Sequence, residues 1–87
     1  MEAGRPFFIH CNSNDPHRPF YGAPSVKPPP RSVPSRVYTA GEVSVPGFLP
    51  DLPAVRMDVA QYCSSVRRLD DVVGAVLDAL TAEQVRD

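Results

Sequence analysis

The apolar residues in the second half of the chain recur at alternating steps of four and three positions, from residue 55 to residue 80. Residues three and four apart lie on the same face of a helix, so this heptad repeat forms one stripe. The pattern therefore predicts a long amphipathic helix over residues 51–80. The residues expected to bind a partner along this stripe are Val55, Val59, Tyr62, Val66, Leu69, Val73, Val76, Leu77 and Leu80.

Both ends of this predicted helix carry local signals. Asp51 is a residue type that caps helices, and Pro53 falls in the first turn, where its missing N–H costs nothing. Thr81 and Gln84 have the spacing of a capping box, which indicates a break near residue 81. Residues 81–87 are accordingly expected to form a short turn or tail.

The first half of the chain has a different character, because all eleven prolines lie at or before residue 53. Proline lacks an N–H and pushes the residue before it toward extended geometry. Residues 1–50 are therefore predicted to be a mostly irregular, extended, proline-rich arm. Within it, two short β-branched runs separated by Ala40-Gly41-Glu42 predict a small hairpin at 36–45.

The predicted stripe needs a covering, because a lone helix is marginal in water and each exposed apolar side chain forgoes about 1.5–3 kcal/mol. The covering is a second copy, a different protein, or the first half of the chain itself. Ordering the arm costs about 1–2 kcal/mol per residue, and its apolar residues are few and interrupted by proline. The sequence therefore favours an extended arm plus one helix without an independent globular core.

The arm contains two near-copies of one motif, Arg-Pro-Phe-Phe at 5–8 and Arg-Pro-Phe-Tyr at 18–21. Arginine and aromatic residues dominate binding hot spots, and proline limits the cost of ordering. The candidate partner-binding residues of the arm are Arg5, Phe7, Phe8, Arg18, Phe20 and Tyr21.

Charge and length narrow the classes of function. The chain has 87 residues and a net charge of −1, so there is no electrostatic case for binding nucleic acid or a membrane surface. The longest apolar run, 72–77, is far shorter than a membrane span, and the first residues do not resemble a signal peptide. These features predict a cytoplasmic, intracellular protein.

Candidate chemistry is sparse. His10, Cys11, Asp15 and His17 are metal-ligand types, but their spacing matches no common zinc motif, and the two cysteines favour free thiols over a disulfide scaffold. There is no nucleophile elbow, phosphate-binding glycine loop or paired-carboxylate motif. We therefore expect no catalytic residues, no metal and no cofactor.

Together these patterns predict a non-enzymatic structural or assembly subunit. It would bind one or more larger proteins through its aromatic, proline-rich arm and through a helix docked in a groove or bundle. Self-association through the helix stays open. The alternative is a small folded binding module, a hairpin plus helix with or without a stabilising metal, that presents the proline-rich segment 27–31 as a ligand.

Overall fold

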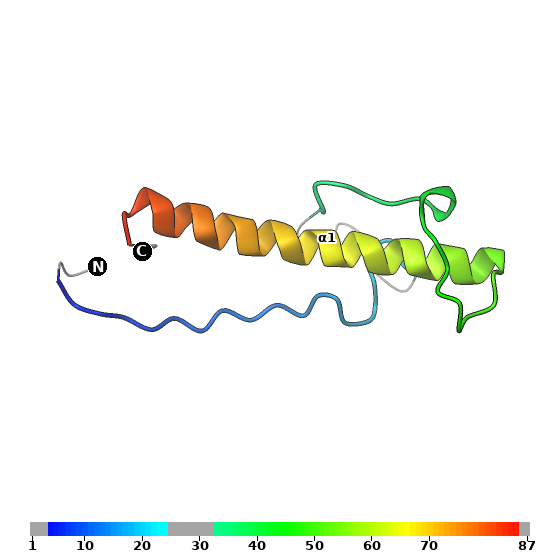
Figure 1. Ribbon diagram of the computed structural model, residues 1–87, viewed down its shortest axis with the longest axis horizontal. Coiled ribbons are helices and arrows are strands. Elements are labelled where there is room, and N and C mark those ends of the chain that lie inside the picture. The colour runs from blue at the N-terminus through cyan, green and yellow to red at the C-terminus, as the bar shows by residue number, and fades with distance from the viewer. Residues whose placement is uncertain (1–3, 25–32, 86–87) are drawn as a thin grey trace.

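The protein is built around one long helix. The computed structural model describes residues 4–24 and 33–85, and in these ranges it contains α1 (Pro53–Ala82) and a single 3-10 turn, η1 (Ala40–Glu42), with no β-strand. Thirty residues at 1.5 Å each make α1 about 45 Å long, which accounts for most of the 55 Å length of the molecule. Figure 1 shows residues 4–24 and 33–52 running alongside this helix. The prediction of a helix-dominated arrangement is thus confirmed.

The molecule is elongated rather than compact. Its radius of gyration is 17.0 Å, compared with about 12 Å for a compact domain of this length. Its accessible surface is 6959 Å², compared with about 5,000 Å² for a folded monomer of this mass. The chain therefore leaves much more surface in water than a self-contained domain does.

The start of α1 differs from the prediction in its cap. Leu52 occupies the N-cap position and makes no side-chain capping bond, and Pro53 begins the helix. The Asp51 carboxylate instead accepts hydrogen bonds from Arg56 Nε at 2.5 Å and Nη2 at 2.8 Å. The expected Asp51 cap was wrong, because a two-point ion pair with a cation one turn into the helix competes with the backbone N–H groups.

The end of α1 lies two residues beyond the predicted limit. The Thr81 hydroxyl donates to the Leu77 carbonyl at 3.0 Å inside the helix instead of capping a new turn. The helix ends at Ala82, and Gln84 follows with a φ of 60°.

The hairpin expected at 36–45 does not form, and this prediction was wrong. The Tyr38 N–H donates to Ser64 Oγ on α1 at 2.9 Å, not to a neighbouring strand. The Glu42 carboxylate accepts from both the N–H and the hydroxyl of Thr39 at 3.0 Å. These local and helix-directed bonds use the groups that a hairpin would pair, so the segment folds as η1.

The first half of the chain packs against the face of α1 that carries small side chains. The buried residues of the helix are Ala60, Ser64 and Ser65, and Phe20 and Val43 of the first half are buried as well. Ser64 and Ser65 accept the N–H groups of Tyr38 and Tyr21. At 3.6 residues per turn, Ala60 and Ser64 lie roughly opposite the apolar stripe, whereas Ser65 borders it, three positions after Tyr62. The chain therefore folds back on its helix and covers mainly the side that the heptad pattern does not mark, together with Tyr62, which meets Phe20.

In the described ranges, no helix combines the length and apolar content needed to cross a bilayer.

Candidate functional site: a loop held against the helix

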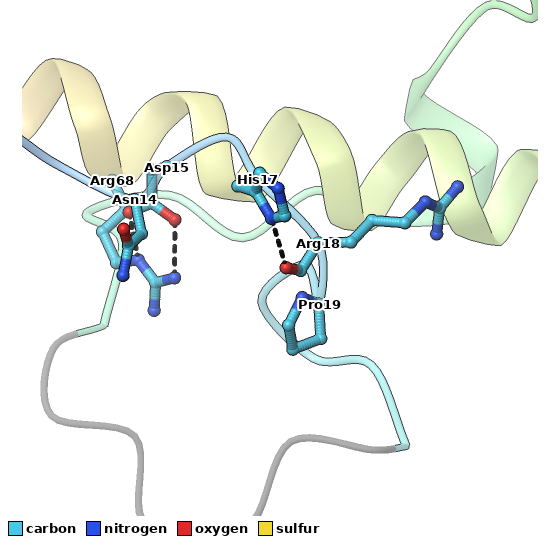
Figure 2. A pocket seen from close by; sticks show the side chains of 6 residues that line it. All are labelled: Asn14, Asp15, His17, Arg18, Pro19 and Arg68. Carbon is cyan, nitrogen blue, oxygen red and sulfur yellow. Dashed lines mark hydrogen bonds and ion pairs between the residues drawn. The ribbon is translucent and has the colours of Figure 1, made fainter.

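A hollow lies between α1 and the segment 13–22, which we call the held loop. It has a volume of about 470 Å³ and is lined by Asn14, Asp15, His17, Arg18, Pro19 and Arg68. Figure 2 shows five of these residues on the loop and Arg68 reaching across from the helix. The site thus joins residues that are far apart in the sequence.

The first part of the loop is a turn built by its own side chains. The His17 N–H donates to the Asn14 carbonyl at 2.7 Å, and the Asp15 N–H donates to Ser13 Oγ at 3.1 Å. Asn, Asp, Ser and Pro are the residues that favour such turns, and residues 12–16 consist of these types. The peptide bonds before Pro16 and Pro19 are both cis.

The strongest link between the loop and the helix is the ion pair of Asp15 with Arg68. Arg68 Nε and Nη2 each donate to a different carboxylate oxygen at 2.7 Å (Figure 2). The side chains keep only 19% and 10% of their surface exposed, so water screens the pair less than a typical surface pair. The Arg68 guanidinium also lies 5.5 Å from the ring centre of Tyr21. The hydrogen bond to Asp15 is the main cause of the raised pKa of Arg68.

A second ion pair links Arg18 to Asp58 further toward the start of the helix. Its two hydrogen bonds measure 3.0 and 2.6 Å, and Arg18 also stacks over Phe20 at 4.5 Å. The hydrogen bond from Arg18 is the main cause of the lowered pKa of Asp58. Because 66% and 43% of the two side chains are exposed, solvent screens this pair much more strongly.

The last part of the loop is fixed by packing and backbone bonds. Phe20 is buried and meets Tyr62 edge to face at 5.4 Å. The Tyr21 N–H donates to Ser65 Oγ at 2.8 Å, and Gln61 Nε2 donates to the Gly22 carbonyl at 3.3 Å. Gly22 has a φ of 87°, a conformation that other residues rarely adopt.

His17 lies between these anchor points. Its Nδ1 is 2.7 Å from the Arg18 carbonyl oxygen, which can only accept a hydrogen bond. Nδ1 therefore carries the proton, and in the neutral ring Nε2 is an acceptor. Among the described residues, Nε2 has no hydrogen-bond partner. The hollow thus contains one imidazole nitrogen that is open to a further group.

The two copies of the arm motif are used differently. Arg5 and Phe7 are exposed, and Phe8 keeps 90% of its surface in water. In the second copy, Arg18 is paired with Asp58, and Phe20 and Tyr21 pack on the chain's own helix. The two motifs have nearly the same sequence, so the sequence does not indicate this difference, which is whether the motif contacts α1.

The predicted contact residues of the helix form an open row. Tyr62, Val66, Val73 and Val76 are between 37% and 48% exposed. The other members of the stripe are half-buried: Val55, Val59, Leu69, Leu77 and Leu80. The role of this row in binding a partner stays a prediction.

Sequence reasoning missed the helix residues that hold the loop, namely Arg68, Asp58 and Ser65, and it missed Ser64, which holds the separate segment at Tyr38. The adjacent serines on the helix were a signal for close approach of another segment, because their side chains are small.

Cys11 and Cys63 are free thiols, and no group of three or more metal-ligand side chains occurs in residues 4–24 and 33–85. The proline-rich segment 27–31 lies outside the described residues.

The sequence of the chain is similar to part of a known enzyme. It is 37% identical over 90 aligned positions to the human N-sulphoglucosamine sulphohydrolase, and the match covers 87% of this chain but 18% of that protein. The chain thus spans less than a fifth of the length of this curated relative. No family model and no solved structure matches the chain.

Proposed function

We propose that the chain is a docking segment of a larger hydrolase of the sulphohydrolase type. In this proposal, the apolar stripe of α1 packs against the remaining body of the enzyme, and the held loop faces its reaction site. The observation that carries the proposal is the 37% identity that runs through 87% of this chain and stays within 18% of a sulphohydrolase.

The physics of the helix supports a larger body. The stripe leaves Val66 and Val73 at 38% and 48% exposure, and the surface of the molecule exceeds that of a compact monomer by roughly 2,000 Å². Burial of apolar surface contributes about 25 cal/mol per Å², so covering the stripe is favourable. The arrangement agrees with the docked helix that the heptad pattern predicts.

The chemistry of the held loop supports the type of reaction. A sulphohydrolase handles an anionic group, and guanidinium and imidazole N–H groups are good donors to anionic oxygens. The hollow contains two arginines and His17, although Asp15 and Asp58 balance the charge of the arginines. We therefore assign to His17 the contact with the reacting group, because its Nε2 is open.

Under this proposal the isolated chain is not itself an enzyme. At the hollow, Arg68 is paired with Asp15 and Arg18 is paired with Asp58. Further reacting groups must come from the larger body. The expectation of a non-enzymatic docking subunit thus stays a prediction for the isolated chain.

The test is to purify the tagged chain together with whatever body it docks on in its native cell. Hydrolysis of N-sulphoglucosamine is then measured for that preparation and for the isolated chain. We expect activity in the former and none in the latter. His17→Ala should abolish the activity without loss of the body, whereas His10→Ala should leave it intact, because His10 lies outside the hollow.

A docked preparation that does not hydrolyse this substrate would overturn the proposal. That result would favour the second candidate, a subunit of a non-hydrolytic assembly, which is supported by the open stripe and by the exposed Phe7 and Phe8.

A further inference from the structure

The backbone that carries His17 is anchored on both sides. Two residues before it, Asp15 pairs with Arg68, and one residue after it, Arg18 pairs with Asp58. Arg68 and Asp58 are ten residues apart on α1, so the two anchor points are separated by about 15 Å along the helix.

These two anchors are not equal. The Asp15–Arg68 pair has exposed fractions of 10% and 19%, whereas the Arg18–Asp58 pair has 66% and 43%. A pair that solvent reaches is screened and contributes little, so of the two pairs the shielded one contributes more to holding the first part of the loop, whereas residues 20–22 are held by packing and backbone bonds. The ring of Tyr21 lies against Arg68 as well, which holds the guanidinium from a second direction.

The backbone conformation of the loop at residues 17 and 18 sets the contact of the His17 ring. The hydrogen bonds of the two ring nitrogens determine which of them carries the proton in a neutral imidazole. Here that bond goes to the carbonyl of Arg18, a backbone group of the held loop itself. A loop that leaves the helix is free to lose this 2.7 Å contact, and the ring is then free to exchange tautomers.

We propose that Arg68 is a positioning residue, which holds the loop through its two-point pair with Asp15 so that His17 keeps Nδ1 protonated and presents Nε2 as an acceptor in the hollow. An acceptor nitrogen fixed in this way binds an O–H or N–H group of a ligand and can take its proton. The effect on the ring follows from the geometry alone. The benefit to hydrolysis rests on the proposed function.

The chain offers a matched control for this role. Arg67 is the neighbouring residue on α1 and carries the same charge, but it donates to Ser35 Oγ at 2.8 Å and lies 3.4 Å from Asp71. Neither of these partners belongs to the held loop. A change at Arg67 therefore removes one guanidinium without touching the anchor of His17.

The experiment is nitrogen NMR of the two histidine rings in the full chain, recorded at a pH above which the ring signals no longer change, so that both rings are neutral. In the unaltered chain, we expect His17 to show one protonated Nδ1 and one unprotonated Nε2. His10 and His17 are both exposed, but the His10 ring makes no hydrogen bond within residues 4–24 and 33–85 and should show the averaged signals of two exchanging tautomers. Arg68→Gln should move the His17 signals to the averaged pattern, and Arg67→Gln should leave them unchanged.

Two results would overturn the proposal: a His17 pattern equal to that of His10 in the unaltered chain, or a single-tautomer pattern that survives Arg68→Gln. If Arg68→Gln lowers the helix content by circular dichroism, Arg68→Lys and Asp15→Asn replace it. Lysine keeps the charge but cannot grip both oxygens. At least one of these variants must shift the His17 signals with the helix intact, or the proposal fails.

In the active preparation, Arg68→Gln should lower kcat on the order of 10²-fold with KM nearly unchanged, because the reacting group is misplaced rather than removed. A preparation without sulphohydrolase activity would overturn the proposed function and leave the NMR result standing. Normal activity in Arg68→Gln with averaged His17 signals would show instead that the positioning has no role in hydrolysis.

Discussion

At the scale of single residues, the hydroxyl of Ser64 links the first half of the chain to the helix. It is 1% exposed, donates to the Ala60 carbonyl at 2.9 Å and accepts the N–H of Tyr38 at 2.9 Å. Alanine at this position leaves that part-buried N–H without its partner. Such an unsatisfied group costs about 1–3 kcal/mol.

We therefore expect Ser64→Ala to lower the free energy of unfolding by about 1–3 kcal/mol and to speed hydrogen exchange at the Tyr38 amide. The measurements are chemical denaturation and amide exchange by NMR. Ser44→Ala is the matched control, because Ser44 is exposed. Equal exchange at Tyr38 in both variants would contradict the role of the hydroxyl.

Glu42 gives the η1 turn a dependence on pH. The hydrogen bond from Arg36 is the main cause, followed by the bond from the Thr39 N–H, and together they lower the pKa of Glu42 from 4.5 to about 2. The unfolded chain therefore binds more protons between these two values. The contribution of the Glu42 carboxylate to stability is complete above about pH 4.5 and is lost as the pH falls toward 2.

A carboxyl titration followed by carbon NMR should give a Glu42 midpoint well below 4.5. Over the same range, exchange at the Thr39 amide should become faster as the acid protonates. Glu42→Gln should remove this pH dependence while other carboxylates still titrate. A midpoint at the ordinary value would show that the turn does not hold the charged form.

At the scale of elements, the two faces of α1 have separate roles. The small-residue face is covered by the chain itself, and the stripe through Val66 and Val73 stays open. We expect Val66→Asp or Val73→Asp to abolish docking to the larger body, because burying an unpaired charge costs about 3 kcal/mol or more, over a hundredfold in Kd.

The same substitutions should leave the helix content of the isolated chain nearly unchanged, since both valines are already in water. Co-purification and circular dichroism measure the two effects. Ala75→Asp is the control, because Ala75 is exposed on α1 away from the stripe. Unaltered co-purification of Val66→Asp would rule out the stripe as the docking surface.

The helix could be predicted from the sequence to within two residues at either end, because its apolar period is a local property. The route of the first half could not. It depends on the close approach allowed by Ser64 and Ser65, and on a pair, Asp15 with Arg68, whose members are 53 positions apart. No spacing rule marks such a pair, so the held loop and its hollow emerge only from the structure.

At the scale of the whole molecule, the open stripe should make the isolated chain associate with itself. The accessible surface of 6959 Å² is well above the roughly 5,000 Å² of a compact monomer, and a net charge of −1 provides almost no repulsion between copies. Sedimentation should therefore show a mass that rises with concentration.

Salt distinguishes the cause of this association. Apolar burial does not weaken as salt is added, whereas contacts between exposed ion pairs do. We expect the association to persist at high salt and to be suppressed by Val66→Asp, but to be unaffected by Arg18→Gln, which removes an exposed ion pair and a contact with Phe20 but leaves the valines of the stripe in place. A monomer at every concentration would mean that the stripe is not adhesive by itself. Association that disappears with salt would mean that charges, and not the valines, hold the copies together.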